Sequence, residues 1–400
     1  MEIGLSRFNE VFEEAGVPRD HYASLFETLG ELGADAVAAR IFSWAHQRLE
    51  GLGATFSADD SDERIIPVDW MPRIVTRDHW QHLSDGLLQR GRAINVWLEA
   101  LYGDGQDVVP RELVESSAFY RPHAIPKGSC PVRVYGPDVV HMGGGEYMVL
   151  EDNVRVPSGV AYSEAIRRAG MDVLPELFEP YRVAEIFSYY DTLRRTFEDA
   201  TPDGSDEPNV AVVTRGREDS AYIEHSRIAE ACGLPLLTLA DCYVKNGEVR
   251  SRWDGRRIDV IYRRFDEDYV DTDLPELKKV YLEGRVRFAN GFGVGVADDK
   301  AIFPFVPEMI DAHLGERPIL ANATTYALTE EEPRSEAIER LPEMVLKPHE
   351  GYGAQGLLIG PEAGRKEIEA ARRNVRENPT GFVVQETLEF SAHILDETSE

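Results

Sequence analysis

Residues 146–159, EYMVLEDNVRVPSG, directly follow three consecutive glycines. The glycines are preceded by a β-rich run, VRVYGPDVVHM (132–142). Two β-rich runs joined by a tight glycine turn predict a β-hairpin. The carboxylates and the carboxamide in this hairpin make its register important, because the register decides which side chains share a face.

The position of the loop within the glycines sets that register. If the last two glycines form the loop, Gly143 pairs with Glu146. Counting back along the ladder then places Asp138 opposite Glu151, and the period-two alternation puts Asn153 on the face of Glu151. Facing carboxylates repel each other, whereas Mg²⁺ prefers such oxygen ligands. The face is a candidate metal site, but a turn that slips by one residue would move one strand's side chains away.

Length and composition predict a globular, intracellular protein. The chain has 400 residues, of which 42% are hydrophobic, enough for two or three domains with sizeable cores. No apolar run approaches the roughly 20 residues that span a bilayer, and the N-terminus lacks the pattern of a secretory signal. Three cysteines without CxxC spacing predict neither disulfides nor a zinc site, which favours a reducing, cytoplasmic location.

The net charge of −29 excludes some partners and suggests a habitat. Such an acidic surface argues against binding to nucleic acids and to anionic membranes. It also suggests a halophilic origin, because at about 1 M salt the Debye length falls to about 3 Å and self-repulsion is screened.

The pattern of apolar residues predicts an α+β fold with an α/β subdomain. Residues 1–60 are expected to form an N-terminal helical region, and residues 61–400 one larger domain. Within that domain we distinguish three parts: the hairpin (130–160), an α/β subdomain (207–330) and a lysine- and glycine-containing subdomain (340–400). After the polar linker at 201–209, the order strand–helix–strand implies a parallel crossover. Ser158 is a plausible N-cap for the helix that follows the hairpin.

GYGAQG (351–356) matches the G-x-G-x-x-G pattern of phosphate-binding loops. A dinucleotide-binding loop requires a following helix, but LLIGP, which follows here, is β-like. A β-loop-β glycine flap fits better, because its amide groups can approach phosphate oxygens closely. A plain glycine hairpin stays open as an alternative. Lys347 favours the flap, since a lysine in an otherwise apolar strand needs an anionic partner.

Lys300 is a second candidate for contact with an anion. It follows a glycine-rich segment, and AIFPFVPEMIDAHL (301–314) after it has helical spacing. A helix N-terminus favours anions. In the alternative interpretation, Asp298 and Asp299 cap that helix and Lys300 is an ordinary surface lysine.

Two polar pairs remain ambiguous from the sequence. Gln385 and Glu386 end the apolar strand FVVQE, where a polar pair often only marks a strand end that meets water. Arg263 and Arg264 could bind a carboxylate or phosphate in a bidentate manner. Salt bridges to the acidic residues at 266–268 are an equally good explanation.

Five motifs, in this order, resemble a known family: LEDNVRVPSG (150–159), IYRRFDEDYVD (261–271), NGFGVGVADDKAIFPFVPEMI (290–310), VLKPHEGYGAQG (345–356) and FVVQE (382–386). They look like those of the circularly permuted ATP-grasp type 2 proteins, relatives of glutathionylspermidine synthetase, over roughly residues 64–390. The resemblance implies a fold in which ATP lies between two α+β subdomains under a glycine flap. Permutation places the metal-binding residues before the nucleotide-binding lysines, as they are ordered here.

The resemblance also implies roles for individual residues. It implies that Mg²⁺ is held by Asp138, Glu151 and Asn153. It implies that ATP is contacted by Lys300, Lys347, the flap glycines Gly351, Gly353 and Gly356, and, near the adenine, Gln385 and Glu386. It implies catalytic roles for Lys347 and for Arg155, which would steady the transferring phosphate or the acyl phosphate.

The activity implied by the resemblance is ATP- and Mg²⁺-dependent ligation of a carboxylate to an amine through an acyl phosphate. The substrates would be small molecules or peptides. Family members usually continue past the FVVQE strand with a further segment, so the chain is expected to be incomplete at its C-terminus or completed by a partner chain. The alternative is a non-catalytic or partner-dependent nucleotide-binding subunit.

Overall fold

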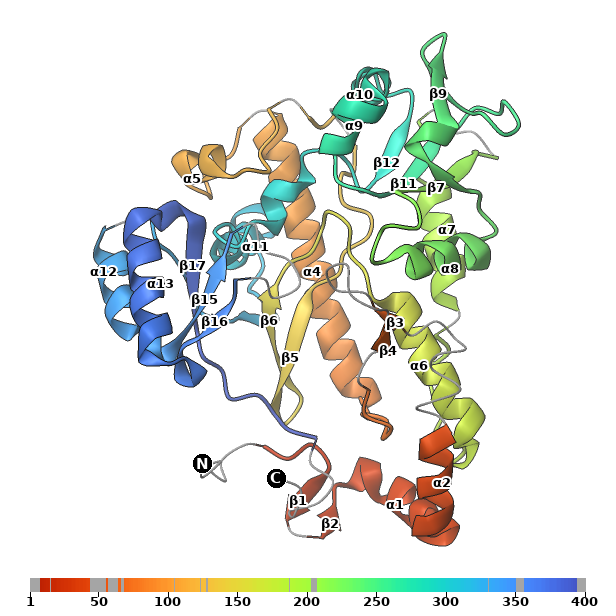
Figure 1. Ribbon diagram of the computed structural model, residues 1–400, viewed down its shortest axis with the longest axis vertical. Coiled ribbons are helices and arrows are strands. Elements are labelled where there is room, and N and C mark those ends of the chain that lie inside the picture. Colours follow the sequence, from red (N-terminus) through yellow and green to blue (C-terminus); the bar gives the residue numbers. More distant parts are fainter. Residues whose placement is uncertain are drawn as a thin grey trace. The chain divides into compact units, whose positions relative to one another are not determined.

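The structure is a computed structural model (Figure 1). The residues that it describes are 8–14, 16–43, 55–56, 64–65, 68–103, 105–122, 124–126, 129–186, 188–202, 207–329, 331–349 and 356–393. Among the helices of these residues, none has both the length and the apolar composition needed to cross a membrane.

The chain folds into two compact units, each built from three separate stretches. Unit 1 comprises Met1–Phe8, Arg77–Pro157 and Asn290–Ala392. Unit 2 comprises Asn9–Thr76, Ser158–Ala289 and His393–Glu400. These units do not follow the domain boundaries expected from the sequence, and that domain division remains a prediction.

Unit 1 contains two small sheets and the helices that pack on them. Its helices are α4 (Arg77–Tyr102), α5 (Arg111–Ser116), α11 (Val306–Leu314), α12 (Glu331–Arg340) and α13 (Arg365–Glu377), with 3₁₀ turns η4 (Val294–Asp298) and η5 (Phe303–Phe305). Its strands are β5 (Asp138–Gly143), β6 (Glu146–Glu151), β13 (Ala321–Asn322), β14 (Thr325–Ala327), β15 (Met344–Pro348), β16 (Leu358–Ile359) and β17 (Phe382–Glu386). The strand orders are β13-β6-β5 and β14-β17-β15-β16.

Periodic apolar residues build the core of unit 1. α4 buries Ile94, Trp97 and Leu98 at helical spacing, and these pack with Met309 and Ile310 of α11. Full burial of such side chains contributes about 1.5–3 kcal/mol each. The second sheet is covered by α12 and α13, which lie side by side in Figure 1 and share a core cluster with its strands.

The β5–β6 hairpin confirms the predicted register at both of its ends. Gly143 pairs with Glu146, and Asp138 pairs with Glu151. The φ angles of Gly144 (+60°) and Gly145 (+86°) suit a two-residue turn in which both residues are left-handed. The prediction misses the middle of the hairpin, where two irregularities shift the pairing by one residue and then cancel.

Unit 2 combines N-terminal elements with a parallel sheet. Its helices are α1 (Asp20–Leu32), α2 (Ala34–Ser43), α6 (Val160–Val173), α7 (Ser188–Glu198), α8 (Tyr222–Cys232), α9 (Asp268–Asp273) and α10 (Pro275–Leu282). Its strands are β1 (Phe12–Glu14), β2 (Val17–Pro18), β3 (Thr55–Phe56), β4 (Arg64–Ile65), β7 (Val210–Thr214), β8 (Leu236–Thr238), β9 (Cys242–Lys245), β10 (Glu248–Ser251), β11 (Val260–Arg264) and β12 (Arg287–Ala289). The parallel sheet has the order β12-β11-β7-β8, which confirms the predicted crossover.

Three local predictions are corrected by the structure. The N-terminal region is not wholly helical, because β1 and β2 precede its helices, with Gly16 at φ +74° between them. The helix expected to start at 301 begins only at Val306, after the short 3₁₀ turn η5, which has a proline in its first turn. Ser158 does not cap α6: the backbone N–H groups of Gly159 and Ala161 donate to the carboxylate of Glu224 instead.

Candidate functional site

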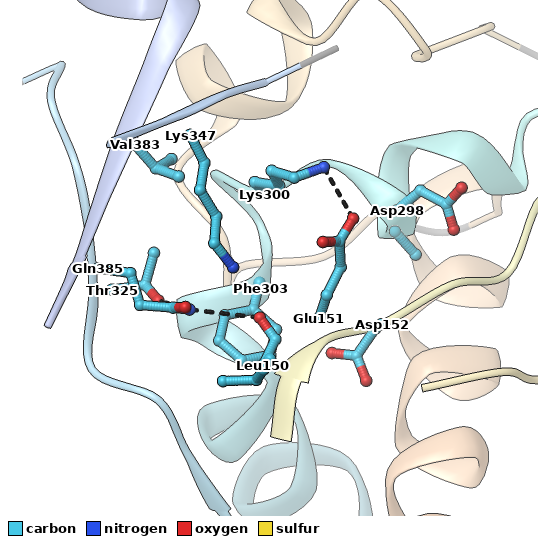
Figure 2. A pocket seen from close by; sticks show the side chains of 11 residues that line it. Leu150, Glu151, Asp152, Asp298, Lys300, Phe303, Thr325, Lys347, Val383 and Gln385 are labelled. Atoms are coloured by element: carbon cyan, nitrogen blue, oxygen red, sulfur yellow. Dashed lines mark hydrogen bonds and ion pairs between the residues drawn. The ribbon is translucent and has the colours of Figure 1, made fainter. Parts of the chain in front are cut away.

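Unit 1 contains a pocket with about 250 Å³ of unfilled space, part of it open to solvent (Figure 2). Its walls come from the end of β6, the turn after η4, and strands β14, β15 and β17. The lining residues are Leu150, Glu151, Asp152, Ala297, Asp298, Lys300, Phe303, Thr325, Lys347, Val383 and Gln385. Segments that lie far apart in the sequence therefore meet here.

Glu151 and Lys300 form an ion pair at the centre of this pocket. Their Oε1 and Nζ atoms lie 2.7 Å apart, and the two side chains are 22% and 12% exposed. Glu151 is the last residue of β6, and Lys300 lies in the turn between η4 and η5. The turn position replaces the helix start that the sequence suggested for Lys300.

Asp138 and Asn153 lie beside Glu151. Asp138 faces Glu151 across the hairpin. The side chain of Asn153 makes a hydrogen bond to the carboxylate of Asp138. The pKa of Asp138 is raised, first because surrounding protein atoms displace water from the carboxylate and then because Glu151 is negatively charged. The predicted oxygen-rich face is thus present, and its charges favour a cation.

Lys347 approaches the same charges from the other sheet. It lies on β15, paired with Val383 of β17, and its side chain points into the pocket in Figure 2. Burial lowers the pKa of Lys347, and the positive charge of Lys300 acts in the same direction, against the attraction of Glu151 and Asp138. Two lysines and two carboxylates are therefore gathered at one place.

Asp152 is an anchor that the sequence analysis missed. It points away from the face of Glu151 and accepts two hydrogen bonds from the guanidinium of Arg90 on α4, at 2.6 Å (Nη2) and 3.2 Å (Nε). Tyr135 also donates to this carboxylate, and Arg90 donates to Asn322 of β13 at 2.6 Å. The sequence held one signal for this ion pair: Arg90 lies on the apolar face of a core helix, where a buried arginine needs an acidic partner.

Arg155 is held away from the pocket lining. Its Nε donates to Asp298 at 2.6 Å, and its guanidinium lies 4.1 Å from the centre of the Phe119 ring. Asp298 also accepts a hydrogen bond from the backbone N–H of Val154. Burial raises the pKa of Asp298, and the positive charge of Arg155 opposes that rise. The predicted catalytic role of Arg155 remains a prediction.

The alternative interpretation, in which Asp298 and Asp299 cap the following helix, is wrong, because no side chain caps η5 or α11. Asp299 accepts hydrogen bonds from Ser117 at 2.6 Å and from the backbone of Ala301 at 2.9 Å, and lies 3.4 Å from Nδ1 of His349. The turn at 297–300 (ADDK) therefore contacts three segments: the residues after β6, those after α5 and those after β15.

Gln385 and Glu386 point to opposite faces of β17. Gln385 lines the pocket, and its amide donates to Thr325 Oγ1 at 2.8 Å and to the backbone oxygen of Leu150 at 3.3 Å. Glu386 instead binds Arg340 at 2.9 Å and Tyr326 at 3.2 Å. Of the predicted pair, the structure brings only Gln385 to the pocket.

The glycine flap is described only at its far end. Gly351 and Gly353 lie outside the described residues. Gly356 has φ +73°, and a Cβ atom there would lie 2.8 Å from Pro348 Cγ, so glycine is required on both counts. The middle of LLIG, Leu358–Ile359, forms strand β16, which pairs with β15.

The donor set fits a hard cation. Among the described residues, no group of three or more histidine, cysteine, aspartate or glutamate side chains is arranged to hold a metal ion. The predicted set is different in kind, with the carboxylates of Asp138 and Glu151 and the carboxamide of Asn153, all oxygen ligands that suit Mg²⁺. The pKa of Asp138 is raised chiefly by burial, and the charge of Glu151 acts in the same direction.

The comparison with known families decides the identity of the fold. The sequence model of a family described as circularly permuted ATP-grasp type 2 matches residues 72–397. The chain belongs to this family. The resemblance inferred from five motifs is therefore confirmed, as is the predicted α+β, circularly permuted ATP-grasp fold.

Relatives of this ATP-grasp protein are found in several bacteria. An uncharacterized protein of Synechocystis sp. is 36% identical over 407 residues, which covers 96% of this chain and 84% of that protein. An uncharacterized protein of Mycobacterium tuberculosis is 33% identical over 402 residues, covering 96% of this chain and 73% of its own length. A Frankia casuarinae protein, provisionally named a glutamate–cysteine ligase, is 35% identical, and the match spans 47% of its length.

A solved structure supports the same fold. A glutathione synthetase-like effector from Globodera pallida, in its apo form, superimposes with a TM-score of 0.54 at 11% sequence identity. The match covers 90% of this chain and 83% of that one. At this low identity the similarity concerns the fold alone.

Proposed function

We propose that this ATP-grasp protein is an ATP- and Mg²⁺-dependent carboxylate–amine ligase. The observation that carries the proposal is the meeting of Lys300, Lys347 and Glu151 in one pocket of unit 1, with Asp138 opposite Glu151 in the hairpin. Two ammonium groups suit the negative oxygens of a phosphate chain. The two carboxylates suit the metal ion that accompanies it. The provisional name of the Frankia relative points to the same class of reaction.

Mg²⁺ would be held by Asp138, Glu151 and the carboxamide oxygen of Asn153. When bound, the ion supplies positive charge that neutralises phosphate oxygens and draws electrons from the transferring group. In the structure, the ammonium of Lys300 pairs with the carboxylate of Glu151 at 2.7 Å. If that carboxylate held the ion, Lys300 would be released to contact a phosphate oxygen.

In the proposed reaction, an oxygen of the substrate carboxylate attacks the γ-phosphorus of ATP. The bond to the β–γ bridging oxygen breaks, its electron pair leaves with ADP, and an acyl phosphate forms. An amine that has lost its proton then attacks the acyl carbon, and inorganic phosphate departs with the electrons of the C–O bond. No protein nucleophile is needed, so the work of the chain is positioning and charge neutralisation.

The residues contribute to these steps at separate points. Lys300 and Lys347 hold phosphate oxygens, and Lys347 follows the transferring γ-phosphoryl group. Arg155, released from Asp298, would steady the acyl phosphate. The flap glycines Gly351, Gly353 and Gly356 close over the phosphates with their backbone N–H groups.

The adenine would pass the end of β17. Gln385 is better placed for this contact than Glu386, because only Gln385 lines the pocket.

The proposal is tested by a screen for ADP release. The full chain is incubated with Mg-ATP in high salt, with pairs of substrates drawn from amino acids, small peptides and polyamines. A ligase releases ADP over many turnovers only when both a carboxylate and an amine substrate are present, because the amine must consume the acyl phosphate, and chelation of Mg²⁺ stops the release. Tight ATP binding without ADP release in any combination would contradict the ligase and favour a partner-dependent nucleotide-binding subunit.

A further inference from the structure

The parallel sheet of unit 2 has a switch point between its two central strands. β7 is followed by α8 and β8, which lies to one side, whereas β11 is followed by α9, α10 and β12, which lies to the other side. β7 and β11 are neighbours in register. In open α/β sheets, ligands bind at the carboxyl ends of two strands whose connections diverge in this way.

A buried network makes the edge rigid. Thr214 ends β7 and pairs with Arg264, which ends β11. The hydroxyl of Thr214 lies 2.8 Å from Nδ1 of the buried His225, and Arg264 lies 3.4 Å from the carboxylate of Glu224. Arg264 also donates to the hydroxyl of Ser158. Ligand-binding side chains hold their geometry best when they rise from a fixed base of this kind.

Two arginines stand on the loop that leaves β7 at this edge. Arg215 and Arg217 are both exposed. The guanidinium of Arg215 lies 4.5 Å from the centre of the Tyr269 ring on α9. That of Arg217 lies 5.6 Å from the centre of the Tyr222 ring at the start of α8. One arginine therefore reaches toward the crossover that leaves β11, and the other toward the crossover that leaves β7.

Contact with an aromatic ring leaves the hydrogen-bonding edge of a guanidinium available. A ring engages the flat face of the group, and the N–H donors lie in its plane. Within the described part of the chain, neither Arg215 nor Arg217 forms an ion pair with a carboxylate. A guanidinium that already packs against a ring loses less conformational entropy when it binds a planar carboxylate than one without such a contact.

The acidic residues around the arginines narrow the class of ligand. Glu218 is exposed on the same loop, and Asp266 and Asp268 are exposed directly after β11. Their negative charge disfavours polyanions such as a phosphate chain, but it favours a ligand that carries an ammonium group beside its carboxylate. An amino acid or a short peptide has both groups.

We propose that Arg215 and Arg217 bind the carboxylate of an amino-acid-type substrate at the carboxyl edge of the unit 2 sheet. This inference rests on the proposed ligase function, because it names one of the two substrates to be joined. The carboxylate held here is one that takes no part in the reaction. The substrate must therefore carry either a second carboxylate for activation or an amine for attack.

Binding without nucleotide tests the proposal separately from the ligase reaction. Each of the twenty standard amino acids, and its α-carboxamide, is titrated calorimetrically into the full-length wild type, R215Q and R217Q. R182Q is the matched control, because Arg182 is an exposed arginine of unit 2 outside the loop that carries Arg215 and Arg217, and its loss changes the net charge equally. Circular dichroism and thermal melts establish that each variant is folded.

We expect at least one amino acid to bind the wild type and R182Q alike, and its α-carboxamide to bind much more weakly. R215Q and R217Q should each weaken that binding about tenfold or more, as expected for a charge-assisted hydrogen bond. R215K should recover only part of the affinity, since lysine lacks the planar fork. Binding of no amino acid to the wild type, or equal binding to R215Q and R182Q, overturns the proposal. Failure of the ligase function would instead appear as absent ADP release with amino-acid binding intact.

Discussion

Asp138 and Glu151 are like charges that the hairpin register places opposite each other. Such a pair destabilises a sheet when nothing neutralises it. The raised pKa of Asp138 reflects first the loss of water around its carboxylate and then the repulsion from Glu151. Lys347 shows the opposite shift: burial disfavours its positive charge and lowers its pKa. Buried charges of this kind are costly for the fold, and they are typical of functional sites. We propose that their role is to bind a ligand with both positive and negative groups, such as a metal-bound phosphate chain.

The buried His225 gives a prediction about pH. Burial and the nearby Arg264 lower its pKa to about 2, so the folded chain keeps it neutral, whereas the unfolded chain protonates it near pH 6.5. The stability contributed by this histidine is present above pH 6.5 and is lost as the pH falls. Relative to H225N, the wild type should therefore lose about 2 kcal/mol of unfolding free energy between pH 8 and pH 5.

Urea denaturation of both proteins across this pH range measures the difference. Asparagine retains a polar atom near the position of Nδ1, so its contact with the hydroxyl of Thr214 can persist. Parallel curves of stability against pH for the two proteins would mean that His225 is not held neutral in the fold.

At the scale of single residues, the sequence predicted which residues pair across strands whose side chains alternate regularly. The pairing of Asp138 with Glu151 follows from period two and a two-glycine loop, and the structure has it. The anchoring of Asp152 by Arg90 was not predictable, because it depends on a helix 62 residues away in the sequence. The separation of Gln385 from Glu386 was predictable in principle, since neighbouring strand residues face opposite ways.

At the scale of elements, the β5–β6 hairpin depends on its turn. Gly145 has φ +86°, and a Cβ atom there would lie 2.5 Å from Nε2 of His79. G145V should therefore lower the unfolding free energy by about 1–3 kcal/mol, because a β-branched residue is strained at positive φ.

G144N is the matched control for this turn. Gly144 has φ +60° with open space around its Cβ position, and asparagine tolerates that conformation. G144N should change stability by less than about 0.5 kcal/mol. Equal stability of G145V and G144N in urea denaturation would contradict the assigned turn.

Helix α4 fixes the end of β6 through the pair formed by Arg90 and Asp152. Both side chains are 0% exposed. R90M should cost about 3–5 kcal/mol, because it leaves a buried carboxylate without its partner. On the same helix, Arg92 pairs with Glu316, and these side chains are 60% and 41% exposed. R92Q should cost less than about 1 kcal/mol. Similar urea midpoints for R90M and R92Q would show that the buried pair does not anchor the strand.

Element prediction succeeded where hydrophobic periodicity was strong and failed at turns. α4, the parallel strands of unit 2 and β15 lie where the pattern placed them. The start of α11 was misplaced because the apolar spacing continues through the 3₁₀ turn η5. Ser158 was misjudged as a cap because the competing carboxylate of Glu224 comes from a helix 63–65 residues further along the chain.

At the scale of the whole molecule, each unit draws on three stretches of chain. Sequence patterns report on local structure, so they could indicate the elements of both units but not this interleaving. The family resemblance supplied the fold and the expected site, and the match over residues 72–397 confirms the family. The roles of individual site residues remain proposals.

The net charge of −29 predicts a dependence on salt. Self-repulsion should destabilise the fold in dilute buffer and be screened at about 1 M salt, where the Debye length is about 3 Å. Thermal melts between low salt and molar KCl should show a rising midpoint, with loss of structure after dialysis to low salt. Cooperative folding in dilute buffer, with a midpoint that salt does not raise, would contradict a halophilic adaptation.

The central claim is that the β5–β6 hairpin is the metal-binding part of an ATP-dependent ligase. The measurement that tests it most directly is the rate of ADP release from Mg-ATP, with the most active substrate pair, by the wild type, E151Q and E146Q. Glu146 begins the strand that Glu151 ends, so both variants remove one carboxylate from β6. We predict that E151Q loses at least about 100-fold in rate, while E146Q keeps the wild-type rate and both remain folded. ADP release by E151Q at the wild-type rate would contradict the account.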